Sequence, residues 1–556
     1  MPSRTHRAAI TWGDCYIAGT GESGYILTHP NNPDIVYVGA IGSSPGGGNA
    51  LQRYDHRTGQ LRLITTWPEY MGGYGSEDHK YRFAWTYPIV ISPHDANTLY
   101  IGGNMVFRSV DEGQSWQPIS PDLTRADPET LKPTGGPVNR DSIGAEVYAT
   151  VFALIESPHE AGVLWAGSDD GLLHLSRNGG ERWQHIDTLD LPEWTLISCI
   201  EPSPFEKGTV YLACTRYKND DYRPYLYKTS DYGASWQRID SGIAEHDFTR
   251  VIRADPARRG LLYAGTETGL YVSFDDGQQW QRFQLNLPVS PIHDLVLKDG
   301  DLIAGTHGRS IWVLDDLSPL QQMSDQVTSG AAWLFKPRTT VRPLTGIDWS
   351  STNPGKQYIN AVGGQFIVSK TPENAVERHF LDAGQNPPKG AMITYFLNDA
   401  PEQPLKLSIA DASAQSSATL VAVPSRSRAR SRRANGSFRQ LSVSTASLGI
   451  CAAVGRAKSK AASRSSRAKC RGHACRPASI RGRGKSANRS SARAGRWCRS
   501  QPSPVQRKIW PRSTICRGRS TIRWIRVGRA GTVCAICASS STAGQSAWRS
   551  TSRARR

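Results

Sequence analysis

One octapeptide pattern, S/T-x-D/N-x-G-x-x-W, occurs four times between residues 109 and 280 and strongly limits what the chain can fold into. The pattern predicts a tight turn between two strands, in which Asp or Asn caps backbone N–H groups, Gly takes a positive φ and Trp packs beside the strands. We therefore interpret the four copies as structural rather than catalytic. Their defining residues are Ser109, Asp111, Gly113 and Trp116; Ser176, Asn178, Gly180 and Trp183; Thr229, Asp231, Gly233 and Trp236; and Ser273, Asp275, Gly277 and Trp280.

A second pattern interlocks with the first and occurs six times. An apolar strand leads through a turn, which contains Pro in five of the six copies, to a second strand that ends in Gly or Ala, as in Val251 to Pro256 followed by Leu261 to Gly265. The motif tryptophans lie 67, 53 and 44 residues apart, which brackets the length of a four-stranded blade with variable loops. The chain is therefore predicted to be all-β, with a β-propeller of six visible four-stranded blades that closes as a six- or seven-bladed ring.

Charge divides the chain into two unlike parts. The net charge of the 556 residues is +19, but residues 1–423 carry 34 basic against 48 acidic side chains, whereas residues 424–556 carry 33 basic and no acidic ones. Seven of the ten cysteines also lie in the basic part. The other three, Cys15, Cys199 and Cys214, are too few and too widely spaced to indicate a disulfide framework.

Two explanations for the basic tail stay open. A frameshift in a GC-rich gene would produce its Arg, Ser, Ala, Gly, Cys and Trp, and a true basic arm would bind nucleic acid through Arg and stacked Trp. We favour the frameshift and expect a disordered segment, because so little apolar periodicity cannot offset the ordering entropy. The expected divisions are 1–24, a lead-in with a truncated start; 25–317, the propeller; 318–390, a connector; 391–413, the start of an incomplete β-sandwich; and 414–556, the basic low-complexity tail.

Short motifs give little support for cofactor chemistry. Gly19 to Gly24 satisfies G-x-G-x-x-G, but a strand rather than a helix follows, so a dinucleotide site is not expected. Cys470 with Cys475, and Cys534 with Cys537, resemble zinc-ligand pairs but lie in the basic tail. We expect no cofactor, no metal, no membrane segment, no nucleic acid bound to the propeller, and a monomer. Met1 to Gly24 lacks the apolar core of a signal peptide.

The candidate site lies on one face of the predicted propeller. If strands alternate in direction, the octapeptides and Pro turns share one face, and the loops that lead into each first strand share the other. On that second face, paired carboxylates are candidates for acid and base or nucleophile, and aromatic and basic side chains are candidates for ligand contacts. The alternative is that these carboxylates are solvated or structural. The catalytic candidates are Glu77, Asp78, Asp220, Asp221 and Asp247; the binding candidates are Arg82, Arg216, Tyr217, Arg223, Arg250, His307 and Arg309.

The octapeptides and blades resemble the BNR or Asp-box repeat family, which includes sialidases, oligoxyloglucan-acting glycoside hydrolases and sortilin-like receptors. More closely, Thr215 to Tyr225 and Ala304 to Ser310 look like large bacterial proteins labelled glycosyl hydrolase or sortilin-like. The resemblance covers about residues 12 to 410 and implies a secreted or periplasmic protein. Sialidases use an arginine triad, and no such triad aligns here; Arg82, Arg250 and Arg309 match only by expected position.

Two functions follow from the residues and the resemblance. The first is a propeller that binds a glycan or peptide in its central pit and hydrolyses glycosidic bonds through rim carboxylates. The second is a non-catalytic, sortilin-like propeller that only binds its ligand. Two carboxyl groups about 5 to 10 Å apart, one of them in an apolar setting, would favour the enzyme. Carboxylates that are all solvated or paired with Arg would favour binding.

Overall fold

The structure of the chain is a computed structural model, and its description is confined to the better-placed residues. Within these, no helix is long and apolar enough to span a membrane. Most of the segment predicted to be a frameshifted, disordered tail lies outside the described residues, and so do the four tail cysteines of the zinc-like pairs except Cys537. The described residues are 9–19, 24–39, 50–70, 72–140, 142, 147–340, 355–359, 364–370, 376–381, 383–387, 391–398, 405–410, 416–422, 437–443 and 537–538.

The fold is all-β, and antiparallel blades succeed one another in chain order as a β-propeller. In the described residues, blades 1 to 5 have four strands each and blade 6 has three. The strands are β2 (Ile26–Thr28), β3 (Ile35–Val38), β4 (Gln52–Asp55) and β5 (Gln60–Leu63) in blade 1; β6 (Ile89–Ile91), β7 (Leu99–Gly102), β8 (Val106–Ser109) and β9 (Gln117–Pro118) in blade 2; β10 (Val151–Glu156), β11 (Leu164–Ser168), β12 (Leu173–Ser176) and β13 (Trp183–His185) in blade 3; β14 (Leu196–Pro202), β15 (Val210–Arg216), β16 (Asp221–Thr229) and β17 (Gln237–Arg238) in blade 4; β18 (Thr249–Ala254), β19 (Leu262–Thr266), β20 (Leu270–Ser273) and β21 (Gln281–Arg282) in blade 5; and β22 (Ile292–Lys298), β23 (Asp301–Thr306) and β24 (Ile311–Leu314) in blade 6.

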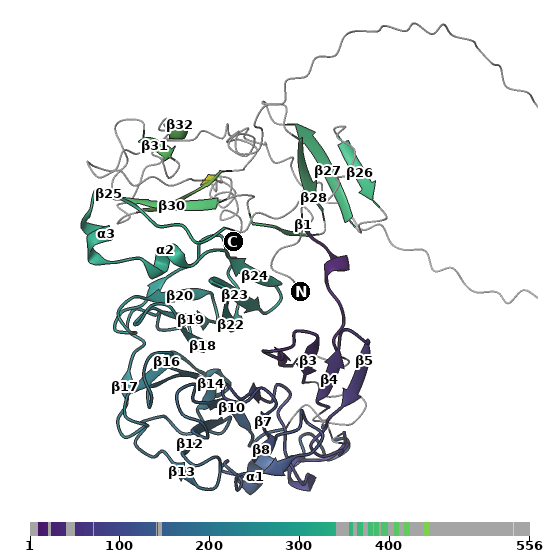
Figure 1. Cartoon of the computed structure of the whole chain (residues 1–556). Helices are drawn as coiled ribbons and strands as arrows, with labels where there is room; N and C mark the ends of the chain where they lie inside the picture. The colour runs from purple at the N-terminus through teal and green to yellow at the C-terminus, as the bar shows by residue number, and fades with distance from the viewer. Residues whose placement is uncertain are drawn as a thin grey trace, which may run out of the picture. The chain divides into compact units, whose positions relative to one another are not determined.

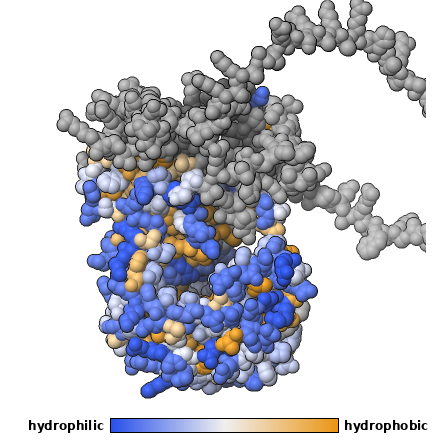
Figure 2. Space-filling model, in the orientation of Figure 1, coloured by the Kyte–Doolittle hydropathy of each residue, from blue (hydrophilic) through white to orange (hydrophobic). Residues whose placement is uncertain are grey.

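The first strand of each blade is the innermost one. First strands contact those of the neighbouring blades, from β2 with β6 to β18 with β22, and Figure 1 shows blades 2 to 6 following one another around a common centre. The apolar core lies between the blades, since separate clusters join blades 1 and 2, 2 and 3, 3 and 4, and 4 to 6. Hydrophilic residues cover most of the propeller surface in Figure 2, which is hollowed near the centre of that view.

The remaining described elements include short helices and strands outside the blades. Gln321 donates to both carboxylate oxygens of Asp255 (3.1 Å each), which ties α2 to blade 5. Three further sheets have the strand orders β25-β30-β33-β34, β26-β27-β28 and β31-β32, and β1 pairs with β29. The bounds are η1 (Trp12–Asp14), η2 (Ser76–Asp78), α1 (Pro128–Leu131), η3 (Tyr217–Asn219), α2 (Ser318–Gln321), α3 (Asp325–Ser329), β1 (Ala9–Ile10), β25 (Ala332–Leu334), β26 (Gly355–Ile359), β27 (Gly364–Lys370), β28 (Val376–Phe380), β29 (Gly384–Gln385), β30 (Ala391–Leu397), β31 (Leu405–Ala410), β32 (Ser416–Ala422), β33 (Ser437–Val443) and β34 (Cys537–Ala538).

The octapeptide forms the turn between the third and fourth strands of its blade. In the last copy, Gly277 N donates to Ser273 Oγ (2.9 Å), and Gln279 N donates to Asp275 Oδ1 (3.0 Å). Gly277 has φ +86°, and a Cβ there would lie 2.8 Å from Ile239 Cδ1 of the preceding blade. Glycine is therefore required both by the left-handed backbone and by the close approach of two blades.

The motif tryptophan fastens its blade to the one before it. The indole N–H of Trp116 donates to the carbonyl of Ile64 (2.8 Å), and Trp183 and Trp280 bond to Ile119 and Ile239 in the same way (2.8 and 2.5 Å). The fourth motif tryptophan, Trp236, has no such bond among the described residues. These contacts agree with the structural interpretation of the motif.

We expect Asp275→Ala to destabilise the propeller by about 1 kcal/mol, because the Gln279 N–H loses its acceptor. Urea unfolding of the full chain would measure the difference. Glu181→Ala changes an exposed position in another octapeptide and should leave the midpoint unchanged, since no hydrogen bond of its side chain is described. Equal midpoints for Asp275→Ala and the parent would contradict the capping role.

Candidate functional site

Hydrogen bonds between loops define two opposite faces of the propeller. On the face that we call the turn face, the octapeptides bond to the Pro turns, as in Asp276 N to Gly260 O (2.9 Å). On the face that we call the loop face, the loops before first strands bond to the loops between second and third strands, as in Glu267 N to Phe248 O (3.1 Å) and His307 N to Pro291 O (2.9 Å). The structure thus separates the octapeptides from the candidate site residues.

On the loop face, side chains from blades 4, 5 and 6 form one continuous group. The rings of Tyr217 and Phe248 stack at 5.1 Å and 16°, and the Arg250 guanidinium lies 5.4 and 4.9 Å from their centroids. Arg250 also pairs with Glu267 at 2.6 Å. The rings of His293 and His307 meet edge to face at 4.7 Å. We call this group the loop-face cluster: Tyr217, Phe248, Arg250, Glu267, His293 and His307.

Electrostatics keep His293 neutral near pH 7. Loss of water contact lowers its pKa to about 4, and the positive charge of Arg250 and the second imidazole of His307 act in the same direction. The cluster therefore offers one guanidinium, already matched by Glu267, together with neutral imidazole and aromatic surfaces. Such a group recognises a ligand through ring faces and directional hydrogen bonds rather than through net charge.

Below this mouth, charged side chains from three innermost strands meet at the propeller axis. Arg253 of β18 bonds to Glu201 of β14 (3.2 Å) and to Asp294 of β22 (2.8 Å). Burial is the largest effect on Tyr25 of blade 1 and raises its pKa, and the nearby Asp294 carboxylate raises it further. The pit at this depth is occupied by an internally matched ion network, which leaves the loop-face mouth for a ligand.

The five catalytic candidates do not form a pair of the kind that a hydrolase needs. Glu77 and Asp78 are exposed in η2, and Asp220 is exposed after η3. Asp221 forms an ion pair with Arg223 (2.8 Å) and accepts from Tyr225, so the pKa of its carboxyl is lowered. Each of the three stands apart from an apolar, pKa-raising environment.

Asp247 is the fifth candidate, and its role in the structure is to join two loops. It is 3% exposed. Its oxygens accept from Thr268 N (2.9 Å), Thr268 Oγ1 (2.7 Å) and the Tyr271 hydroxyl (3.1 Å). A carboxylate with this many fixed donors positions the loop face and has little freedom to exchange protons with a substrate.

A mirror-image contact in blade 3 involves the one carboxyl with a near-neutral pKa. Burial raises the pKa of Asp169 to about 7, although its two oxygens accept from Thr150 N and Thr150 Oγ1 (2.9 Å each). The adjacent Asp170 accepts from Ser168 Oγ (2.6 Å) and Arg125 N (2.9 Å). Both carboxyls hold loops together.

The structure brings together only part of the predicted binding set. Tyr217, Arg250 and His307 belong to the loop-face cluster, and Arg216 precedes Tyr217 with a buried Nε that lacks a hydrogen-bond partner among the described residues. Three others lie elsewhere or are engaged. Arg82 is buried and bonds to Asp122, Thr124 and the Ala149 carbonyl; Arg223 pairs with Asp221; Arg309 is exposed in the loop after His307.

Sequence reasoning missed the axial network. Its signal was present, because Glu201, Arg253 and Asp294 are charged residues inside otherwise apolar first strands. An inward charge at a buried strand position indicates a partner on a neighbouring strand. The loops drew attention instead, since polar residues there are common and easy to notice.

No family model matches the chain, and no curated protein matches it. Among solved structures, the chain is similar to a GH74 xyloglucanase from Xanthomonas campestris (17% identity, TM-score 0.37, 52% of this chain and 44% of that one). It is also similar to an ancestral GH74 enzyme (13%, 0.34, 67% and 47%) and to YCF48 bound to D1 peptide (13%, 0.32, 54% and 86%). The chain thus spans less than half of either GH74 protein.

These neighbours are β-propeller proteins. At this identity and TM-score they carry no argument about activity, so the propeller assignment rests on the sheets of the chain itself. The closer resemblance to the BNR or Asp-box family stays a prediction.

We expect Arg250→Gln to raise the pKa of His293 toward its ordinary value, because a positive charge is removed and Glu267 is left without its partner. NMR titration of histidine-labelled protein would measure the change. His56, which stacks on Tyr16 in blade 1, serves as an internal control and should titrate as before. A wild-type His293 pKa near 6.5 would contradict the described packing.

Proposed function

We propose that this propeller binds a glycan or a peptide at its loop face without cleaving it. The observation that carries the proposal is the loop-face cluster, in which stacked aromatic rings and a guanidinium are held together by contacts across three blades. Such surfaces are pre-formed and therefore lose little entropy when a ligand binds. Tyr217 remains partly exposed and is the ring best placed to be a platform.

The carboxylates support binding rather than hydrolysis. Glu267 is matched by Arg250, Asp221 by Arg223, and Asp247 by fixed hydroxyl and amide donors. A retaining or inverting glycosidase needs one carboxyl in an apolar setting and a second at a defined separation from it. A sortilin-like, secreted-type binding protein fits these residues better than a glycoside hydrolase does.

Hydrolysis remains the second candidate because of one observation, the pKa of about 7 for Asp169 beside Asp170. A general acid near neutral pH has this property. Against it, both Asp169 oxygens are occupied by Thr150. Screening the full chain for release of reducing ends from glycans tests the alternative. Release that is lost in Asp169→Asn but not in Asp275→Ala would replace the binding proposal by a hydrolase.

For the binding proposal, we expect Tyr217→Ala to weaken binding of a ligand identified on glycan and peptide arrays by about tenfold, as expected when a central aromatic contact is lost. Isothermal titration calorimetry would measure the affinity. Phe205→Ala is a matched control, because Phe205 also packs against an arginine, Arg259 (5.3 Å), but in a Pro turn on the turn face.

The two variants must separate for the proposal to stand. Equal loss of affinity in Phe205→Ala and Tyr217→Ala would point to a general effect on folding. Unchanged affinity in Tyr217→Ala would place the ligand elsewhere on the molecule.

A further inference from the structure

The octapeptide of blade 4 matches the other three in sequence but not in its contacts. The indole N–H groups of Trp116, Trp183 and Trp280 all bond to the isoleucine carbonyl that follows the outer strand of the preceding blade. For Trp236 the corresponding isoleucine is Ile186, yet the Trp236 Nε1 is buried and bonds to no described residue. A buried donor without an acceptor costs about 1 to 3 kcal/mol, so this position calls for an explanation.

A larger ring in the preceding blade accounts for the difference. Trp165 stands at the strand position that holds tyrosine in blades 2, 4 and 5. Its indole meets that of Trp236 edge-on, at 6.3 Å and 84°. Thr188, which follows Ile186, donates to the carbonyl of Gly233. The octapeptide is still joined to blade 3, but through Thr188 rather than through its tryptophan.

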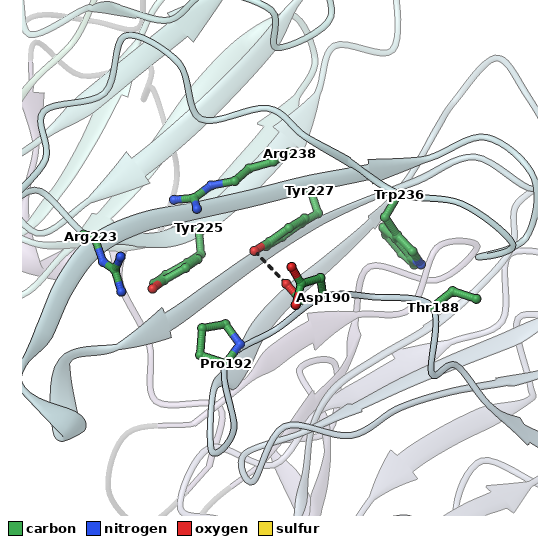
Figure 3. A pocket seen from close by; sticks show the side chains of 8 residues that line it. All are labelled: Thr188, Asp190, Pro192, Arg223, Tyr225, Tyr227, Trp236 and Arg238. Carbon is green, nitrogen blue, oxygen red and sulfur yellow. Dashed lines mark hydrogen bonds between the residues drawn. The ribbon is translucent and has the colours of Figure 1, made fainter.

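The freed indole lines a pocket on the flank of the propeller, which we call the flank pocket. It lies between the outer strands of blade 4 and the segment that connects blades 3 and 4, and its volume is ≈ 390 Å³. Figure 3 shows Trp236 and Thr188 at one end and the arginines Arg223 and Arg238 at the other, with tyrosine rings between them. This size is within the range of small-molecule sites, about 300 to 1,000 Å³.

Charges in the flank pocket are nearly matched before any ligand arrives. Arg223 pairs with Asp221 (2.8 Å) and Arg238 with Asp240 (2.6 Å). The carboxylate of Asp190 has no ion-pair partner in the described part of the chain. The pocket therefore has no surplus positive charge with which to select an anion.

Donors and acceptors are mixed along the walls. Trp236 offers an N–H, the half-exposed guanidinium groups offer further N–H donors, Asp190 offers a carboxylate and Thr188 a hydroxyl oxygen. Hydroxyl groups both donate and accept, so a neutral molecule with several of them can satisfy all these groups together. Aromatic walls supply the apolar contact that the carbon faces of a sugar ring require.

We propose that the flank pocket is a binding site for a sugar unit or a similar neutral polyhydroxylated molecule. In the complex, a ligand oxygen accepts from Trp236 Nε1 and a ligand hydroxyl donates to Asp190. The site is separate from the loop-face cluster and does not depend on the function proposed there.

The test uses the full chain with the methyl glycosides of glucose, galactose and xylose, and with glucuronate as an anionic probe. Saturation-transfer NMR detects binding and calorimetry measures Kd. Trp236→Phe keeps the ring and removes only the N–H, and we expect it to weaken binding about fivefold without lowering Tm, because no intramolecular bond is lost. Asp190→Asn, at an exposed position, should weaken binding as well.

Trp183→Phe is the matched control. Its N–H bonds to the Ile119 carbonyl, so this variant should lower Tm and leave glycoside affinity unchanged. Tyr217→Ala should also leave that affinity unchanged, which distinguishes the flank pocket from the loop face. If Trp236→Phe fails to fold, Asp190→Asn carries the test alone. The proposal is overturned if no methyl glycoside binds, if only glucuronate binds, or if the folded pocket variants bind like the parent chain.

Discussion

The bond from an indole N–H to a carbonyl of the preceding blade is the interaction on which the propeller most depends. Sheets that pack face to face gain free energy from apolar contact, but apolar contact alone fixes neither their angle nor their register. A directional hydrogen bond at one fixed corner does. The glycine of the octapeptide makes this possible, since a Cβ at Gly277 would collide with Ile239, the residue whose carbonyl accepts the bond.

Fixing the blades at the turn face leaves the loop face able to carry function. Loops there are joined by carboxylates such as Asp247 and Asp169, which accept from hydroxyl and amide groups of the facing loop. Further in, Arg253 links three innermost strands through Glu201 and Asp294. Because these ions are matched among themselves, the axis is stabilised and a ligand is left with the mouth, where Tyr217, Phe248 and Arg250 lie.

Repeats made the fold predictable, and pairing made the site only partly so. The octapeptides and the six strand pairs fix strand order, and strand order fixes which loops share a face, so Tyr217, Arg250 and His307 could be placed together from the sequence. Which partner each charge would find could not be predicted, because that depends on contacts between loops of different blades. Asp247 and Arg82 were plausible ligand contacts as letters, and burial with saturated hydrogen bonds makes them structural instead.

Trp236 shows the limit of motif reading most clearly. Thr229 to Trp236 satisfies the pattern as well as any other copy, and its Thr229, Asp231 and Gly233 make the same turn contacts. What differs is outside the motif: Trp165 on the neighbouring blade replaces a tyrosine, and the bulkier ring packs against Trp236. The turn survives because its own backbone bonds are local, whereas the indole bond needs a partner in another blade. A repeat protein can therefore release one joint residue for another use while the local geometry of the repeat is retained, because the remaining apolar contact and the Thr188 bond still hold the two blades together.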